Sequence, residues 1–246
     1  MEQFSRIQLL IGQEAFKKLA PSKVTVIGLG AVGSLCVEAL ARAGVGQFRV
    51  VDFDVIRPSN INRHIWAFHS TLNIPKAQMA KQRLLDINPS VVVDPRVMFA
   101  DMDTLPGILD NTPDLLIDAA DALSLKVQTL EIAYRMGLNV VSSMGAATRT
   151  DPSCIKVGDL MDSKGCPLAK GMRRLLRSRG VERGITCVYS TQIQKTRLLS
   201  SEAVVEAGDV LRGRVRRKLG SLPTVTGIFG LTLAHVALEK LLSKKF

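Results

Sequence analysis

A short apolar segment followed by three closely spaced glycines constrains this chain more than any other feature. Val24 to Ile27 has the composition of a buried strand, Gly28-Leu29-Gly30-Ala31-Val32-Gly33 follows it directly, and Ala31 to Ala43 has helical composition. In such a unit the glycines allow a tight turn, and the backbone N–H groups and dipole of the helix N-terminus can hold a phosphate. The segment therefore predicts a phosphate-binding turn at the edge of a sheet.

The regions after this unit continue to alternate between strand and helix patterns. Further strands are expected at Phe48 to Val51, Val91 to Val97, Leu115 to Asp118 and Asn139 to Ser142, and further helices over 5–20, 75–87 and 124–136. Short apolar strands that alternate with helices are typical of parallel sheets. The pattern predicts an α/β fold, a Rossmann-like, doubly wound and mainly parallel sheet with helices on both faces.

The second half of the chain changes character. A strand is expected at Ile155 to Val157, a helix at Leu168 to Arg179 and an apolar last helix over about 224–244. Because 246 residues can bury one sizeable core, we expect a single domain over 1–246. Its nucleotide-binding half would cover about 1–145, and its substrate-facing half, about 146–246, would include a C-terminal extension with basic segments.

The N-terminus and the last helix bear on localisation. The first residues show no basic region followed by an apolar stretch, so no signal peptide is expected and the protein is predicted to be cytoplasmic. Residues 219–238 hold no charged side chain and could span a bilayer by length, but Pro223 and several glycines favour a buried helix. No integral membrane segment is expected, and peripheral membrane contact through this helix stays open.

The four cysteines show neither a disulfide pattern nor a zinc pattern. Cys36, Cys154, Cys166 and Cys187 lie far apart and include no Cys-x-x-Cys pair. Each is therefore expected to be a small buried hydrophobic residue.

Positive charge is concentrated in two segments. The formal net charge is +11, and residues 170–183 carry six basic side chains against Glu182, while residues 212–218 carry five against none. The basic side chains share one face of the predicted helix, and those of the second segment would do so if it is extended. Such blocks indicate contact with a polyanion. The residues concerned are Lys170, Arg173, Arg174, Arg177, Arg212, Arg214 and Arg216.

A set of polar residues follows the strand after the glycine turn. Asp52 ends this strand, where an acid can accept hydrogen bonds from ribose hydroxyls. The turn and Asp52 alone would suit an NAD-dependent oxidoreductase equally well. Asn60, Arg63 and Lys76 come next, and they suit a triphosphate, because negative charge builds up on departing pyrophosphate. Asp121 follows the fourth strand and is placed to hold Mg²⁺.

In order and spacing these residues resemble the E1-like adenylating superfamily, which includes the activating enzymes of molybdopterin and thiamin biosynthesis. The resemblance implies that ATP is bound through Gly28, Gly30, Gly33 and Asp52, with Asn60, Arg63 and Lys76 at its phosphates. It also links Asp121 to magnesium and places Arg6 at the nucleotide of the neighbouring subunit in a homodimer. Catalytic roles would fall to Arg63, Lys76, Asp121 and Arg6.

The second half is similar to the tRNA threonylcarbamoyladenosine dehydratases. The similarity lies in Gly145-Ala146-Ala147, Asp151-Pro152, residues 155–160, Pro167-Leu168-Ala169 with the arginine-rich helix, and residues 187–191. It implies closure of the N6-threonylcarbamoyl side chain of adenosine 37 in tRNA through an acyl-adenylate, with ATP, Mg²⁺ and tRNA taking part. Cys187 is a candidate sulfur or acyl relay, which would bring in a sulfur-transfer protein. Gln3, where relatives often have Arg, and residues 192–218 depart from the pattern.

Three other functions stay open at this point. The nearest is adenylation of the C-terminal glycine of a ubiquitin-like sulfur carrier. The others are NAD-dependent oxidoreduction and RNA binding without catalysis. Protection against thermal unfolding by ATP or NADH, and the dependence of tRNA binding on ATP, would separate the last two from an adenylating enzyme.

Overall fold

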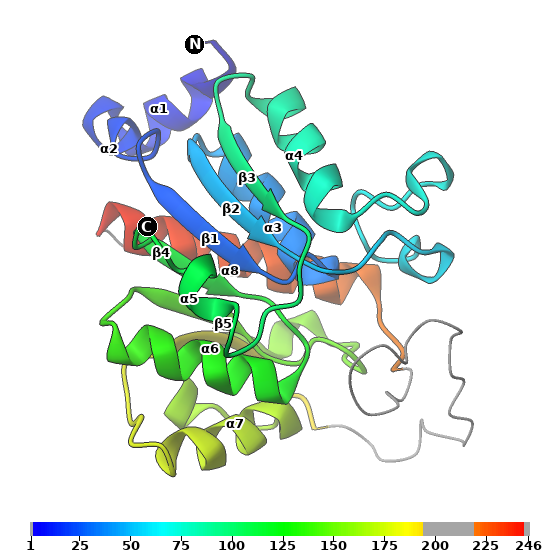
Figure 1. Cartoon of the computed structure of the whole chain (residues 1–246), viewed down its shortest axis with the longest axis vertical. Helices are drawn as coiled ribbons and strands as arrows, with labels where there is room; N and C mark the ends of the chain where they lie inside the picture. The colour runs from blue at the N-terminus through cyan, green and yellow to red at the C-terminus, as the bar shows by residue number, and fades with distance from the viewer. Residues whose placement is uncertain (1, 194–218, 244–246) are drawn as a thin grey trace.

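A seven-stranded β-sheet runs through the centre of the computed structural model, which describes residues 2–193 and 219–243 (Figure 1). Its strand order is β3-β2-β1-β4-β5-β7-β6. The strands are β1 (Lys23–Ile27), β2 (Gln47–Val51), β3 (Val92–Arg96), β4 (Leu115–Asp118), β5 (Val140–Ser143), β6 (Ile155–Asp159) and β7 (Thr186–Ser190). All neighbours are parallel except β6, which is antiparallel to β7 at one edge. The predicted Rossmann-like α/β fold is confirmed.

Helices cover both faces of this sheet (Figure 1). They are α1 (Ser5–Ile11), α2 (Gln13–Lys17), α3 (Ala31–Arg42), α4 (Lys76–Ile87), α5 (Leu105–Ile108), α6 (Leu123–Arg135), α7 (Pro167–Arg177) and α8 (Pro223–Leu242). Single turns of 3-10 helix lie at Glu2–Phe4, Pro58–Asn60, His69–Thr71, Pro152–Cys154 and Leu160–Asp162. Because successive strand residues face opposite sides, Val26 packs in a core with α3, α4 and α8, whereas Ile27 packs in a second core with α5, α6 and α7.

Three elements differ from the sequence-based expectation. The helix expected over 5–20 is broken at Gly12, whose φ of 90° lies in a region that favours glycine and separates α1 from α2. The short helix α5 and strand β7 are absent from that expectation. The five residues of β7 form a strand because they pair with β5 on one side and β6 on the other, and these contacts join segments far apart in sequence.

The C-terminal helix α8 packs against α3, the helix that follows the glycine turn. A Cβ added to Gly230 would lie 2.7 Å from the Val32 carbonyl oxygen, so only glycine permits this approach. The buried side of α8 includes Val225, Phe229 and Leu233. By length and composition alone α8 could cross a membrane, because an 18-residue stretch of it has a mean hydropathy of 1.4. Half of that stretch is, however, buried inside the protein. Its packed side agrees with the buried helix expected from the sequence.

Candidate nucleotide site

The glycine turn joins β1 to α3 in a conformation that side chains would not allow. Gly28 has a φ of 93°, and an added Cβ would lie 2.7 Å from the Ala120 nitrogen. A Cβ on Gly33 would lie 2.0 Å from the Gly28 carbonyl oxygen. At Gly30, by contrast, an added Cβ would meet no atom within 4 Å. The turn is therefore packed tightly on two sides and open at Gly30, next to the N-terminus of α3.

Asp52 holds this turn from the end of the neighbouring strand. One carboxylate oxygen, Oδ2, accepts the Leu29 N–H over 2.7 Å, and Oδ1 accepts the Asp54 N–H over 2.9 Å. Burial raises the pKa of Asp52, although the positive charge of Lys76 and the two backbone donors act against that rise. A carboxylate has about four acceptor positions, so two remain for a ligand.

Lys76 begins α4 and is held close to Asp52 by a second acid. Its Nζ lies 2.7 Å from Asp54 Oδ2, and the Arg57 Nε lies 3.3 Å from Asp54 Oδ1. Burial opposes ionisation of Asp54, but the positive charges of Lys76 and Arg57 outweigh it and lower the pKa of this carboxyl. Asp54 was not among the predicted site residues. The signal that could have found it is a second acid two positions after Asp52.

Asn60 and Arg63 lie in the loop between β2 and α4 and make local contacts. Asn60 Oδ1 accepts the Arg57 backbone N–H over 3.2 Å. The Arg63 Nη1 donates to the Ser59 carbonyl oxygen over 2.7 Å and to Asn62 Oδ1 over 2.8 Å. Arg63 is half-buried, and these two contacts hold its guanidinium within the loop.

His64 connects this loop directly to the glycine turn. Its Nε2 lies 2.7 Å from the Leu29 carbonyl oxygen, and the side chain is buried. The positive charges of Lys76 and Arg63 both help to lower the pKa of His64, the residue that contacts the turn. His64 is a contact that the sequence analysis missed, because a single histidine in a polar loop gives no distinctive pattern.

The segment after β4 forms the other wall of the turn. Asp118 and Lys126 are both fully buried, and Lys126 Nζ lies 2.6 Å from Asp118 Oδ2. The Ser142 hydroxyl donates to the same oxygen over 2.6 Å. Asp118 Oδ1 also accepts the Ala120 N–H over 3.3 Å, which sets the turn that leads to the exposed Asp121. Within residues 2–193 and 219–243, no group of three or more His, Cys, Asp or Glu side chains could hold a metal by itself.

Among the residues predicted for the nucleotide site, Arg6 lies far from the glycine turn of its own chain. It is exposed on α1, near the end of the sheet where β1 begins, whereas the glycine turn follows the opposite end of that strand (Figure 1). The other predicted ligands, Gly28, Gly30, Gly33, Asp52, Asn60, Arg63, Lys76 and Asp121, lie in the turn or in the segments beside it.

Three of the four cysteines are buried, as expected for small apolar residues. Cys36, Cys166 and Cys187 are buried, and Cys154 is partly exposed. Burial raises the pKa of Cys187 to about 12, so its thiol is protonated near neutral pH and inaccessible on β7. The relay role suggested by the sequence gains no support from this placement.

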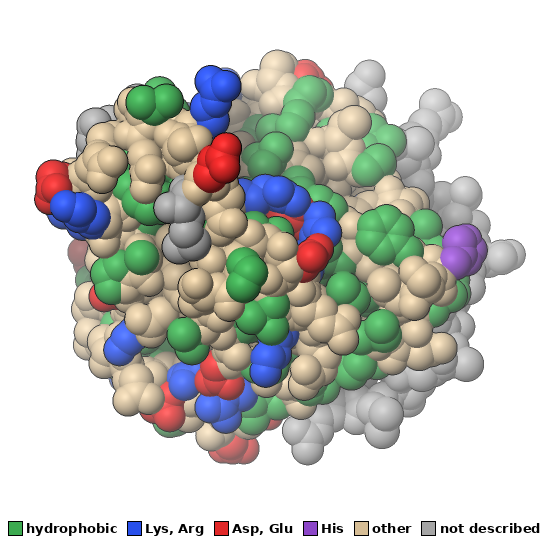
Figure 2. Space-filling view, turned by 90° about the horizontal axis from the view of Figure 1, so that it is seen from above, with side chains coloured by type: hydrophobic (Ala, Val, Ile, Leu, Met, Phe, Trp, Pro, Cys, Tyr) green, Lys and Arg blue, Asp and Glu red, His purple; other side chains and the backbone are tan. Residues whose placement is uncertain are grey.

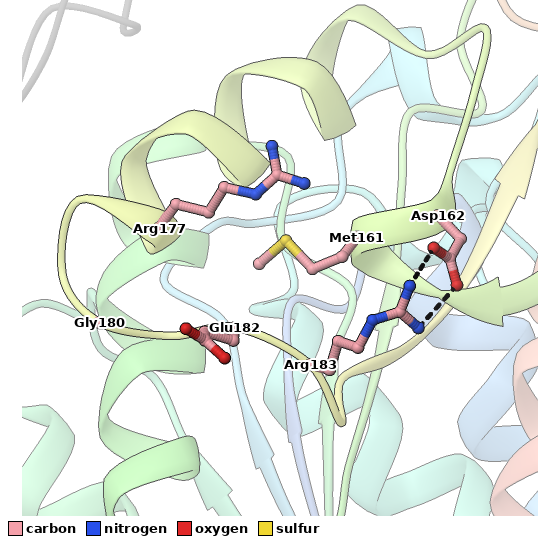
Figure 3. Close-up of a pocket in the computed structure, with 6 residues that line it drawn as sticks. All are labelled: Met161, Asp162, Arg177, Gly180, Glu182 and Arg183. Atoms are coloured by element: carbon pink, nitrogen blue, oxygen red, sulfur yellow. Dashed lines mark hydrogen bonds and ion pairs between the residues drawn. The ribbon is translucent and has the colours of Figure 1, made fainter.

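The basic residues around α7 fall into two groups. Lys170, Arg174 and Arg177 are exposed. Arg173, predicted to lie on the same outward face, is half-buried and donates to Ser163 Oγ over 2.6 Å, so it is less exposed than the other three. Arg183 forms a two-bond ion pair with Asp162 beside an open pocket of about 400 Å³ that Arg177 also lines (Figure 3). Arg212, Arg214 and Arg216 lie outside the described residues.

The sequence and the fold of the chain are similar to those of known proteins. The sequence pattern of the ThiF family matches residues 4–245. The chain belongs to the ThiF family. This ThiF-family chain is 35% identical to the tRNA threonylcarbamoyladenosine dehydratase of Bacillus subtilis, over 90% of this chain and 82% of that protein. It is also 32% identical to the molybdopterin-synthase adenylyltransferase of Salmonella typhimurium, over 72% of this chain and 66% of that protein.

Solved structures show the same fold in relatives of this ThiF-family chain. The Escherichia coli tRNA threonylcarbamoyladenosine dehydratase in complex with AMP aligns with a TM-score of 0.87 and 28% identity, over 98% of this chain and 94% of that chain. The structure of that enzyme in complex with ATP aligns with a TM-score of 0.86 and 27% identity, over the same shares.

Proposed function

We propose that this ThiF-family chain is an ATP-dependent tRNA threonylcarbamoyladenosine dehydratase. The observation that carries the proposal is a cluster in which the glycine turn, Asp52 and the Asp54–Lys76 pair lie together at the carboxyl ends of β1 and β2. Relatives with this activity in their names match nearly the whole chain, and one of them has been solved with AMP and with ATP. The second half, including the arginine-rich helix α7, belongs to the matched region as well.

The chemistry begins with a carboxylate that cannot react unaided. Closing the threonylcarbamoyl side chain into a ring requires loss of water, and hydroxide is a poor leaving group. ATP would supply an AMP group for the threonyl carboxylate, with pyrophosphate released as the acyl-adenylate forms. The ureido nitrogen then attacks the activated carbonyl and expels AMP, so the oxygen that leaves the substrate ends on AMP.

The residues of the chain would act through positioning and charge. The N–H groups at Gly30 and the start of α3 would bind a phosphate, and the free acceptor positions of Asp52 would bind ribose hydroxyls. Lys76 would exchange Asp54 for a phosphate oxygen, and Arg63 with Asn60 would contact the other phosphates. No side-chain nucleophile is needed, so neither a Cys187 relay nor a sulfur-transfer partner is part of this mechanism.

Magnesium would be held at Asp121 together with the phosphates. Protein sites for Mg²⁺ commonly use one or two carboxylates and complete the octahedron with phosphate oxygens and water. One exposed acid beside the turn fits this requirement, and the ion would offset the charge of the leaving pyrophosphate.

The exposed row on α7 is proposed as part of the tRNA surface. Lys170, Arg174 and Arg177 are spaced at i, i+4 and i+7, which places them along one side of a helix. Because only 4% of residues are aromatic, contacts to the phosphate backbone and to RNA shape would dominate over base stacking.

A homodimer is proposed to complete each site with Arg6 from the partner. The same exposed side of α1 carries Leu9 and Leu10, which are 81% and 82% exposed. Such side chains next to an arginine suit a protein interface. Figure 2, which views the molecule from the end where Figure 1 places the N-terminus, shows hydrophobic side chains exposed in several patches on this face.

A cytoplasmic location is proposed, with peripheral membrane contact through α8 as a further expectation. Leu222, Ile228 and Leu231 are exposed on or just before this helix. Co-sedimentation of the protein with lipid vesicles, compared with a Leu231→Glu variant, tests this contact.

Mass spectrometry of tRNA nucleosides tests the function. After incubation with ATP and Mg²⁺, tRNA that carries threonylcarbamoyladenosine should yield a nucleoside lighter by one water, and AMP should accumulate with it. No mass change in the presence of the wild-type protein would contradict the proposal. Pyrophosphate exchange that depends on a ubiquitin-like carrier, and not on tRNA, would favour the sulfur-carrier alternative.

A further inference from the structure

Both backbone polar groups of Leu29, between Gly28 and Gly30, are held by side chains. The Leu29 N–H donates to Asp52 Oδ2 over 2.7 Å, and the Leu29 carbonyl oxygen lies 2.7 Å from His64 Nε2. The Leu29 side chain is fully buried. The backbone of this residue therefore cannot rotate without breaking two hydrogen bonds that are largely shielded from water.

The contacts of His64 fix the position of its ring proton. The Trp66 backbone N–H donates to His64 Nδ1 over 3.2 Å, so Nδ1 accepts and the proton resides on Nε2, which donates to Leu29. The Trp66 indole lies edge-to-face against the imidazole with the ring centroids 5.6 Å apart. Burial, assisted by the charges of Lys76 and Arg63, lowers the pKa of His64 to about 4, so the ring is neutral near pH 7.

The hydrogen bond to Leu29 also orients the next residue. In a trans peptide the carbonyl of one residue and the N–H of the following residue point in opposite directions within one plane. Holding the Leu29 carbonyl against His64 therefore directs the Gly30 N–H away from the imidazole. Gly30 is the glycine of the turn at which an added Cβ would meet no atom within 4 Å, and α3 begins at the next residue.

We propose that His64 is a positioning residue that holds the Leu29–Gly30 peptide so that the Gly30 N–H is presented to a phosphate before the nucleotide binds. The proposal rests on the proposed function for its ligand, ATP. In this role His64 contacts neither the nucleotide nor a reacting atom, and it transfers no proton. A turn that is already oriented binds more tightly because no ordering has to accompany binding.

Two substitutions separate positioning from general support of the fold. His64→Leu removes the donor to the Leu29 carbonyl, whereas His64→Gln keeps an amide N–H of comparable reach. Calorimetric titration of each full-length protein with ATP and Mg²⁺ gives the Kd, and steady-state kinetics with modified tRNA give KM for ATP and kcat. We expect Kd and KM of His64→Leu to rise roughly tenfold or more, kcat at saturating ATP to change much less, and His64→Gln to recover most of the loss.

Leu130→Ala serves as the matched control for lost stability, because Leu130 is fully buried on α6 in the second core. It should lower Tm but leave the Kd for ATP unchanged. Equal Kd values for wild type and His64→Leu, or an equal loss in Leu130→Ala, would overturn the proposal. Weaker ATP binding in His64→Leu with recovery in His64→Gln supports the positioning role, whether or not tRNA is dehydrated. A wild-type protein that binds ATP but dehydrates no tRNA contradicts the proposed function and leaves the positioning role standing.

Discussion

The Lys76 ammonium lies 2.7 Å from Asp54 Oδ2, so the cation at the start of α4 is held by the acid that follows Asp52 by two residues. The Lys76 backbone N–H also donates to the Asp54 carbonyl oxygen over 2.9 Å, and the lysine side chain is only 9% exposed. These contacts hold the positive charge of Lys76 beside the glycine turn. In the proposed mechanism, a phosphate oxygen replaces the Asp54 carboxylate as the partner of Lys76.

Replacing Lys76 by methionine should remove this charge while keeping a similar side-chain volume. We expect turnover to fall by roughly 100-fold or more, since a donor that stabilises developing charge contributes on this scale. ATP-dependent dehydration of modified tRNA, followed by mass spectrometry, gives the rate. Lys81→Met on the exposed side of the same helix is the control and should retain wild-type activity. A fully active Lys76→Met protein would remove Lys76 from the mechanism.

The buried neutral state of His64 predicts a loss of stability in mild acid. Histidine has a pKa of 6.5 in model peptides and about 4 in the folded protein, so between these values the unfolded chain binds more protons. The contribution of neutral His64 to the unfolding free energy is fully present above pH 6.5 and declines by up to about 3 kcal/mol as the pH falls to 4. Urea denaturation at pH 7 and pH 4.5 should show a smaller decline of the unfolding free energy in His64→Gln than in wild type. Identical declines would indicate that His64 does not titrate as inferred.

The two groups of basic residues near α7 should respond differently to substitution. A Lys170→Ala, Arg174→Ala, Arg177→Ala triple variant should bind tRNA more weakly, with the slope of log K against log salt reduced by about 2 for the three lost charges. Arg183→Ala is the control, because its charge is already paired with Asp162. Binding isotherms at several salt concentrations measure both effects. Equal losses in the triple variant and the control would argue against a specific role of the exposed row.

The buried Asp118–Lys126 pair should respond non-additively to substitution. Lys126→Met leaves the Asp118 charge buried with only Ser142 and a backbone N–H as partners, which should cost about 3–5 kcal/mol of unfolding free energy. Asp118→Asn combined with Lys126→Met should recover part of that loss, because no unpaired charge remains. Denaturant unfolding of the single and double variants gives the coupling. Additive losses would show that the two side chains do not depend on one another.

The proposed action of Arg6 on the partner's nucleotide can be tested by mixing two inactive proteins. Arg6→Ala and Lys76→Met should each be inactive, but a hybrid dimer would contain one site with both native residues. Random subunit exchange should therefore restore about a quarter of wild-type activity. Sedimentation measurements should also show that Leu10→Asp weakens the dimer. Mixed proteins that exchange subunits and stay inactive would place Arg6 outside the partner's site.

Much of the fold was predictable because its signals are local. The strand, glycine turn and helix over residues 24–43 follow one another along the chain, so each has its own local pattern. The alternation of strands with helices indicated a parallel sheet without knowledge of any tertiary contact. Strand β7 escaped prediction because its five residues gain strand character only by pairing with β5 and β6. The break at Gly12 escaped because the apolar pattern runs through it.

By itself, the sequence determined the glycine turn and the order of the polar residues that follow it, with Asp52 directly after β2, Arg63 in the next loop and Lys76 at the start of α4. The tertiary structure decided which polar groups are already engaged. Lys76 is paired with Asp54, His64 with the Leu29 carbonyl and Arg183 with Asp162. A hydrogen bond depends on the positions of two groups that the chain brings together from distant segments, and a local pattern specifies only one of them.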